Sequence, residues 1–301
     1  MELNKNKKII VTHDGTFHSD DIFALATLSI YFEKQNETFE VFRTRDEEKI
    51  KNADIVFDVG GIYDKEKNRF DHHQVGGAGK HSNGIEYASF GLVWEKYGVD
   101  IAGGEGEAKI IEEKLVSPID ANDNGMTLSE NKTNIFPYSI QDVFACMRPS
   151  WTEETLTNDE MFLKSVEIAK ILLQREIVQA KGLIIAEEKV LEIYNNTKDK
   201  RIIVLDGKYP YGEKLGEFPE PIYVVRPREN NMSWGVNCIR KEKRSFNNRK
   251  DLPFSWAGLR DEELQKVTGV SDAMFCHRGL FLAVAKTKEG AIALAELALN
   301  N

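Results

Sequence analysis

Histidines and aspartates gather in four short segments near the start of this sequence. The segments are His13–Asp21 (HDGTFHSDD), Asp58–Gly61 (DVGG), Asp71–Gln74 (DHHQ) and Asp120–Gly125 (DANDNG). Five of the six histidines lie at or before residue 81. Imidazole and carboxylate side chains together suit Mn, Fe, Co, Zn or Mg ions. If the four segments meet in space, the sequence therefore predicts a metal centre.

The acidity of these segments strengthens the prediction. Two carboxylates about 4 Å apart repel each other by roughly 4 kcal/mol at an effective dielectric constant of about 20. Several of them in one crevice would strain the fold or become protonated unless cations were present. Two ions about 3.5–4 Å apart can share a bridging carboxylate and activate water for attack on phosphorus. These residue types therefore predict metal-dependent hydrolysis of a phosphoester.

Each segment also has a structural explanation when it is considered alone. Asp20 and Asp21 would stabilise the N-terminus of a helix through its dipole. Asp58 stands before two glycines and could simply close a strand, and Asp120 could be a turn residue. The metal prediction therefore depends on the combination of the segments.

The elements around these segments indicate a fold that can bring them together. Strands are predicted at Lys8–Thr12, Phe39–Arg43 and Asp54–Val59, and a buried helix at Asp20–Glu33. This order is typical of an α/β fold with a mainly parallel sheet flanked by helices. The ligand crevice of such a sheet lies beyond the carboxyl ends of its strands. His13 and Asp58 both fall there.

The remainder of the chain predicts a second, smaller α/β domain. We expect residues 1–199 to form the catalytic domain, including a long helix at Asp159–Asn195, and residues 200–301 to bind substrate. Further helices of the first domain are predicted at Gly84–Val116 and Ile140–Met147. In the second domain, strands are predicted at Arg201–Leu205, Ile222–Val225, Trp234–Ile239 and Leu280–Ala285, and helices at Trp256–Val267 and Glu289–Asn300.

A cationic segment follows one of these predicted strands. Residues 240–250 read RKEKRSFNNRK, and Arg240, Lys243 and Arg244 are candidates for binding substrate phosphates, with Phe246 available for base stacking. His277-Arg278 could add further phosphate contacts. The alternative, which the sequence leaves open, is that the segment is only a solvated surface loop.

Composition limits the remaining possibilities. The net charge of -9 means that the overall field does not attract nucleic acid, so a polyanionic substrate needs metal ions or a local basic patch. Cys146, Cys238 and Cys276 form no C-x-x-C pair, which predicts free thiols. Trp151, Trp234 and Trp256 are expected in the core. No apolar run approaches the roughly 20 residues of a membrane helix, so we expect a cytoplasmic protein without a membrane partner.

The motifs also resemble a known family. Asp71-His72-His73 resembles the signature of the DHH phosphoesterase superfamily. The longer motifs THDGTFHSDD, DVGGIYD, RFDHHQ, SFGLVW, IDANDNG, RPSW and WAGLRDEEL resemble the melanocyte-proliferating-gene family of metal-dependent hydrolases, which includes a 3′–5′ RNA exonuclease. The resemblance runs from about residue 9 to the C-terminus and implies a DHH-like fold.

The resemblance implies a role for each site residue. His13 and His18 would bind one ion, Asp58 would bridge both, and Asp20, His72 and Asp120 would bind the second. His73 would face the substrate phosphate, and Asp71 would orient a histidine; these two are the residues expected to be catalytic. The pattern departs from the superfamily at His18, where an aspartate is usual. The extra nitrogen favours Mn, Fe, Co or Zn over Mg, with Mn expected for the two ions. The usual glycine-rich loop of the second domain is matched only in part by residues 276–280.

The leading hypothesis is a two-metal phosphodiester hydrolase, a 3′–5′ exonuclease on single-stranded RNA or short oligonucleotides. One alternative is a phosphohydrolase for pyrophosphate or a cyclic dinucleotide. Another is a non-catalytic metal-binding protein. Substrate length, RNA or DNA preference and oligomeric state stay open.

Overall fold

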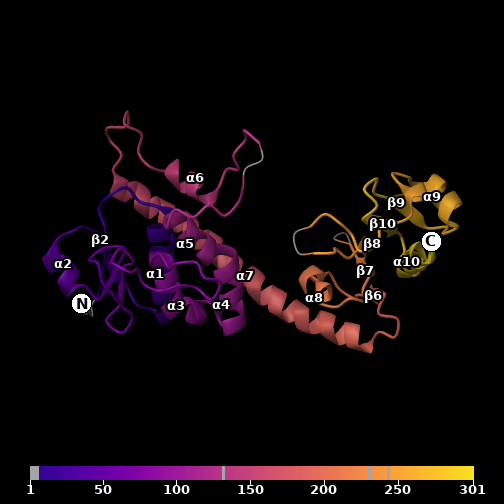
Figure 1. The fold of residues 1–301 in the computed structure, drawn as a ribbon, viewed down its shortest axis with the longest axis horizontal. Coiled ribbons are helices and arrows are strands. Elements are labelled where there is room, and N and C mark those ends of the chain that lie inside the picture. The colour runs from indigo at the N-terminus through magenta and orange to yellow at the C-terminus, as the bar shows by residue number, and fades with distance from the viewer. Residues whose placement is uncertain (1–6, 131–132, 229–231, 243–244) are drawn as a thin grey trace, which may run out of the picture. The chain divides into compact units, whose positions relative to one another are not determined.

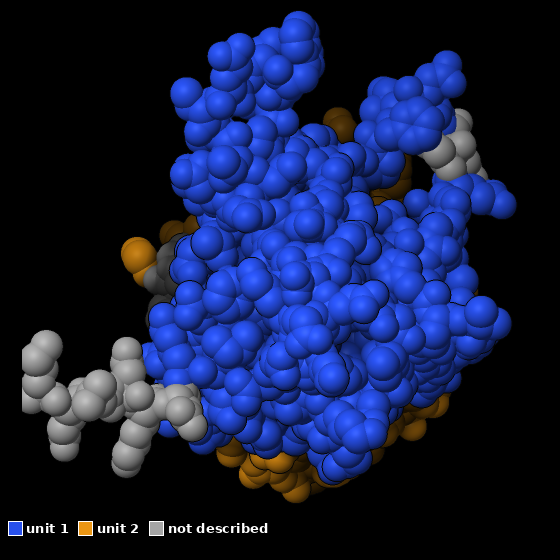
Figure 2. Space-filling model, turned by 90° about the vertical axis from the view of Figure 1, so that its left-hand side faces the viewer, with its two compact units in different colours: residues 1–181 blue, residues 182–301 orange. Residues whose placement is uncertain are grey.

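The chain folds into two compact units in the computed structural model, which describes residues 7–130, 133–228, 232–242 and 245–301. Unit 1 comprises residues 1–181 and unit 2 residues 182–301, coloured blue and orange in Figure 2. This division falls inside the long helix α7 (Asn158–Asn196), whereas the sequence placed the boundary beyond the end of that helix. The reason is that α7 contributes side chains to two cores: Phe162 and Leu173 belong to the core of unit 1, and Val190 and Tyr194 to a core of unit 2.

Unit 1 is built on a five-stranded sheet, and the predicted α/β fold is confirmed. Its strands are β1 (Lys8–Thr12), β2 (Phe39–Arg43), β3 (Ile55–Phe57), β4 (Tyr63–Asp64) and β5 (Arg69–Phe70), in the order β2-β1-β3-β5-β4. All neighbouring pairs are parallel except β4 with β5. In β1, Ile10 and Val11 point to opposite faces and both are fully buried, as expected for a parallel sheet covered on both sides.

Helices surround this sheet (Figure 1). They are α1 (Ser19–Gln35), α2 (Glu47–Asn52), α3 (Ser89–Ala102), α4 (Glu105–Ile111), a π-helical turn η1 (Glu112–Val116), α5 (Ser117–Asp123) and α6 (Ile140–Ala145). Helix α1 is buried along nearly all of its length and packs against α3, where the rings of Phe23 and Phe90 stack with centroids 5.3 Å apart. The predicted helix at Gly84–Val116 begins later, and two glycines after Ala102 interrupt it.

Unit 2 carries a second sheet, in which only the pairing of β6 with β7 is parallel among the strands that the structure describes. The strands are β6 (Ile202–Val204), β7 (Tyr223–Pro227), β8 (Trp234–Cys238), β9 (Ala273–Cys276) and β10 (Leu282–Ala285), in the order β6-β7-β8-β10-β9. The helices are α8 (Gly212–Gly216), η2 (Phe254–Trp256), α9 (Asp261–Thr268) and α10 (Lys288–Asn300). The predicted helix at Trp256–Val267 is thus a 3-10 turn followed by a separate helix.

The structure also bears on the expected burial of the tryptophans, the state of the cysteines and the prediction of no membrane helix. Trp256 is buried as expected, but the side chain of Trp151 is 94% exposed, so its assignment to the core is wrong. Cys238 and Cys276 are buried free thiols, and Cys146 is an exposed one. Among the described residues, no helix combines the length and the apolar character needed to cross a membrane.

Candidate metal centre

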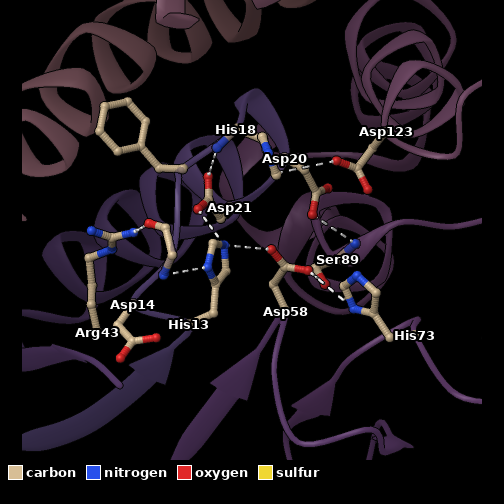
Figure 3. Close-up of polar contacts among 12 residues, drawn as sticks. His13, Asp14, His18, Asp20, Asp21, Arg43, Asp58, His73, Ser89 and Asp123 are labelled. Carbon is tan, nitrogen blue, oxygen red and sulfur yellow. Dashed lines mark hydrogen bonds and ion pairs between the residues drawn. The ribbon is translucent and has the colours of Figure 1, made fainter. Parts of the chain in front are cut away.

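The loop between β1 and α1 places His13 against two carboxylates. His13 follows β1 directly and is 5% exposed, and the Gly15 backbone N–H donates to its Nδ1 at 3.1 Å, which fixes the ring. Its Nε2 lies 3.0 Å from Asp21 Oδ2 and 3.2 Å from Asp58 Oδ2 (Figure 3). Asp21 uses its other oxygen to accept the His18 backbone N–H at 2.9 Å, which caps the start of α1. Asp21 therefore stabilises the start of α1 with one carboxylate oxygen and turns the other towards His13.

Asp58 lies at the centre of the cluster. It follows β3 with a φ of 54°, a left-handed backbone conformation that is uncommon outside glycine and is found where local strain serves a site. One oxygen faces His13, whereas Oδ1 lies 3.5 Å from His72 Nε2 and 3.6 Å from His73 Nδ1. The Ser89 hydroxyl also donates to Oδ1 at 3.5 Å. Asp58 is thus the residue whose two oxygens reach different groups of candidate ligands.

The segment after β5 supplies the histidine pair. Asp71 is 2% exposed and accepts the Gly61 backbone N–H at 2.6 Å through Oδ2. Its Oδ1 accepts the His73 backbone N–H at 3.1 Å and lies 2.7 Å from His73 Nδ1. The side chain of His73 is 62% exposed, whereas that of His72 is 7% exposed, with Nε2 3.3 Å from Asp123 Oδ2. Asp71 therefore orients the exposed histidine, and the buried one faces Asp58 and Asp123.

The N-terminus of α3 binds two buried carboxylates. The backbone N–H groups of Ser89 and Phe90 donate to Asp20 at 3.2 and 2.7 Å, and that of Gly91 donates to Asp120 Oδ1 at 3.1 Å. The first N–H groups of a helix have no partner within the helix and carry partial positive charge, so they offset the charge of these acids. Asp20 still lies close enough to His72 and Asp123 to share a metal ion with them.

Asp120 belongs to a separate network. Its Oδ2 lies 2.7 Å from His81 Nε2, and His81 Nδ1 lies 2.8 Å from Glu112 Oε1 in the π-helical turn. Among the described residues, Asp120 is in none of the groups that could hold an ion. Asp123, one helical turn later on α5, faces the cluster instead. The family resemblance implied Asp120 as a ligand of the second ion, whereas in this structure Asp120 contacts His81.

Three groups in the described chain have ligand atoms within 4.8 Å of one another. They are His13, Asp21 and Asp58; Asp20, His72 and Asp123; and Asp58, His72 and His73. Of the predicted ligands, the structure brings together His13, Asp20, Asp58 and His72. His18 lies at the edge of the cluster: its Nδ1 is 4.0 Å from Asp123 Oδ1, and its side chain is 51% exposed. Asp21 and Asp123 were not predicted. For Asp123, the signal was its spacing of three residues from Asp120.

The charges in the cluster require compensation. Burial, reinforced by the charges of neighbouring aspartates, raises the pKa of Asp20 and of Asp123. Burial alone would lower the pKa of His13, but Asp21 and Asp58 outweigh it and raise that pKa to about 9. The buried atoms Asp21 Oδ2 and His72 Nε2 form no well-aligned hydrogen bond among the described residues, and they contact His13, Asp58 and Asp123 at ion-pair distance only. Buried carboxylates and imidazoles that meet without aligned hydrogen bonds fit a site for divalent cations.

A cavity of about 520 Å³ opens onto this cluster. It is lined by His13, His18, Arg45, Asp58, Val59, Gly60, Gly61, Asp71, His73 and Asp123. All of these residues belong to unit 1. The centre is therefore accessible to a ligand, and the exposed ring of His73 lies on its wall.

The predicted substrate residues belong to unit 2. The Arg240 guanidinium donates to Asn248 Oδ1 at 2.9 Å and lies 5.4 Å from the ring of Phe281, and the His277 ring contacts the same phenylalanine with centroids 4.3 Å apart. Arg278 is exposed in the same turn. The structure thus gathers Arg240 and His277 around Phe281. Lys243 and Arg244 lie outside the described residues.

The raised pKa of His13 predicts how the stability of the metal-free protein depends on pH. The pKa of His13 is about 9 in the folded chain and 6.5 in the reference state, so its ion pairs stabilise the metal-free protein fully below pH 6.5 and lose this effect as pH rises through 9. We expect the Tm of EDTA-treated protein to fall over this range and to fall less in His13→Asn. Equal falls in both proteins, measured by thermal unfolding, would contradict this assignment.

Gly91 has a packing role that predicts a loss of stability on substitution. A Cβ at this position would lie 1.9 Å from Asp120 Oδ2 and 2.6 Å from Tyr87 Cδ1. We expect Gly91→Ala to lower the free energy of unfolding by about 1–3 kcal/mol. Gly182→Ala in α7 is the matched control, because nothing lies within 4 Å of its Cβ; it should raise stability by about 0.5–1 kcal/mol. Chemical denaturation would measure both, and equal effects would refute the close approach of Asp120 to α3.

Comparison with known proteins gives an independent result. Residues 9–299 match the family model MYG1_exonuc, described as "Uncharacterised protein family (UPF0160)". The chain is 30% identical to the MYG1 protein C27H6.8 of Caenorhabditis elegans, covering 97% of this chain and 95% of that one. It is 29% identical to the human MYG1 exonuclease, covering 96% and 85% of the two chains. The family expected from the motifs is confirmed.

One solved structure gives a weaker likeness. A pGpG-specific phosphodiesterase, PggH, from Vibrio cholerae aligns with 98% of this chain and 100% of its own, at 10% identity and a TM-score of 0.31. A TM-score of this size does not establish a common fold.

Proposed function

The chain belongs to the MYG1_exonuc family, and from this premise we propose that it is a metal-dependent phosphodiester hydrolase acting as a 3′–5′ exonuclease on single-stranded RNA or short oligonucleotides. The observation that carries the proposal is the position of Asp58. Its two oxygens face His13 and the His72-His73 pair, so one carboxylate serves two adjoining groups of ligands. Such sharing is typical of centres with two ions.

We assign two divalent ions to this centre. His13, Asp21 and Asp58 would hold one ion, and Asp20, His72 and Asp123 would hold the other, with Asp58 Oδ1 3.5 Å from His72 Nε2. Each set combines imidazole with carboxylate, which supports Mn over Mg, with Fe, Co and Zn as alternatives. Bound there, the ions would supply Lewis-acid polarisation of the phosphoryl oxygens.

The chain's own residues would orient the substrate. In its charged form, the His73 ring donates to Asp71 through Nδ1, and its Nε2 can then donate to a phosphate oxygen in the cavity. Arg45 lines the same cavity with a side chain that is 66% exposed, so its guanidinium can bind a second phosphate oxygen. His73 is thus the catalytic residue of this proposal, and Asp71 positions it.

The open cavity argues against a purely structural metal site. A structural site closes its coordination with protein ligands. Here a cavity of about 520 Å³ and an exposed histidine adjoin the ligands. This arrangement supports turnover over metal storage.

A substrate panel tests the proposal. Mn-loaded protein would be incubated with 5′-labelled and 3′-labelled single-stranded RNA, the same sequences in DNA, a dinucleotide, pyrophosphate and a cyclic dinucleotide. We expect the 5′-labelled RNA to give a ladder of shortened products. Hydrolysis of pyrophosphate or the cyclic dinucleotide alone would replace the exonuclease assignment by that activity. Absence of hydrolysis across the panel with Mn, Fe, Co, Zn and Mg would refute an enzyme of this class.

A further inference from the structure

A second cavity adjoins the metal centre. It measures about 530 Å³ and is lined by Arg45, Glu47, Ile50, Lys51, Val56, Val59, Gly60, Ile62 and Arg69. We call it the side pocket. It shares Arg45, Val59 and Gly60 with the cavity over the metal ligands, so one turn after Asp58 forms a wall of both. A molecule that extends from the metal centre past this turn enters the side pocket.

The side pocket is positively charged in a protein with a net charge of -9. Three cations, Arg45, Lys51 and Arg69, line it against one acid, Glu47, and Arg45 also forms an ion pair with Asp14, with Nε 3.3 Å from Oδ1. The guanidinium of Arg69 is held in place by the backbone carbonyls of Ala53 at 2.9 Å and Lys67 at 3.0 Å. Neither Arg69 nor Lys51 forms an ion pair with any residue that the structure describes. No carboxylate of the described chain therefore neutralises them. The Lys51 ammonium can bind an anionic ligand directly, whereas Arg69, whose terminal N–H groups already donate to four backbone carbonyls, contributes its charge.

The rest of the side pocket's lining is apolar, and the volume of the pocket suits a small ligand. Ile50, Val56, Val59 and Ile62 form this apolar wall, and the side chain of Ile62 is 56% exposed. Pockets of about 300–1,000 Å³ accept small organic ligands. A ligand that uses both the apolar wall and the cations combines an apolar surface with an anionic group, as a nucleotide does.

The turn between the two cavities depends on Gly60. Its φ is 97°, a conformation that side chains rarely adopt, and a Cβ would lie 3.3 Å from Ile50 Cγ2. The backbone therefore approaches α2 closely here. This approach sets Ile50 and Lys51 of α2 directly beside the residues that follow Asp58.

We propose that the side pocket binds the nucleoside next to the phosphodiester placed at the metal centre, with Lys51 and Arg69 near its outer phosphate. The proposal rests on the proposed function, because that function supplies the phosphate at the centre. The aliphatic side chains of the apolar wall offer a base no hydrogen-bonding group, so we expect this wall to favour a nucleoside without selecting one base.

Two substitutions test the side pocket. Ile62→Glu and Lys51→Glu change exposed side chains and place negative charge in it. We expect each to raise the KM for an RNA tetranucleotide about tenfold, with kcat within about twofold. Hydrolysis of methyl 4-nitrophenyl phosphate, which has no nucleoside, should not change. Lys49→Glu is the matched control, because it makes the same charge change on the same helix outside the side pocket; its KM should equal that of the wild type.

The outcomes separate this proposal from the proposed function. An unchanged KM in both variants, or an equal fall in activity on both substrates, would overturn the side pocket as a nucleoside site. Equilibrium titration with 5′-AMP gives a readout that needs no turnover. Weaker AMP binding in Ile62→Glu than in Lys49→Glu would support the side pocket even if the wild-type protein hydrolysed no phosphodiester. Equal AMP affinities would refute it.

Discussion

Asp58→Asn is expected to lower phosphodiester hydrolysis by at least about 10³-fold, which corresponds to a loss of about 4 kcal/mol of transition-state stabilisation. The variant removes the negative charge from the residue that faces both groups of ligands. Asparagine tolerates the left-handed backbone that position 58 requires, so the fold should remain intact. The measurement is the initial rate on RNA with saturating Mn.

The controls for Asp58→Asn are measurements of its thermal stability and of its metal content. Metal-free Asp58→Asn should remain folded with a Tm somewhat below that of the wild type, because it loses the ion pair with His13, and the stoichiometry of bound Mn should fall from two towards one or none. Wild-type activity in a folded Asp58→Asn protein would mean that the hydrolytic centre lies elsewhere in the chain.

We expect Asp123→Asn mainly to weaken Mn binding and activity, and Asp120→Asn mainly to lower the free energy of unfolding. Asp123 faces His72, so its variant should lose more Mn affinity and activity than the roughly 10–100-fold that loss of an outer partner costs. Asp120 accepts from Gly91 and lies against His81, so its variant should unfold more easily, by about 1–3 kcal/mol, while Mn affinity falls at most roughly tenfold.

Mn titration and chemical denaturation of the two proteins distinguish these signatures. His81→Asn provides a further comparison, because it should reproduce the loss of stability seen in Asp120→Asn without the loss of Mn seen in Asp123→Asn. If Asp120→Asn lost the metal and Asp123→Asn kept it, the ligand position implied by the family resemblance would be correct and the geometry of α5 would not represent the metal-bound protein.

The sequence alone determined which segments carry the site. β1 and β3 are short apolar runs that must be buried, and parallel strands bring their carboxyl ends to one edge of the sheet. His13 and Asp58 follow these ends directly, so their proximity could be predicted without coordinates. The histidine pair was predicted from its residue types alone, because β5, the two-residue strand before Asp71, was not predicted.

The tertiary structure decided which group of candidate ligands each acid joins, if any. Asp20 and Asp21 are adjacent on α1, and Asp120 and Asp123 are one turn apart on α5, so composition and spacing do not separate them. The N-terminus of α3 binds both Asp20 and Asp120, and Gly91 leaves room for the latter, but only Asp120 is also held by His81, away from the candidate ligands. Such a contact between residues far apart in sequence has no local pattern.

The position of the boundary between the two units also depends on tertiary packing. The apolar pattern of α7 continues without a proline or a break from residue 158 to 196, so the sequence placed the boundary after the helix. The units divide within it because its two parts pack into different cores, one with Phe162 and the other with Val190. Local sequence determines that a helix forms, whereas only the packing of distant segments determines which core each of its turns joins.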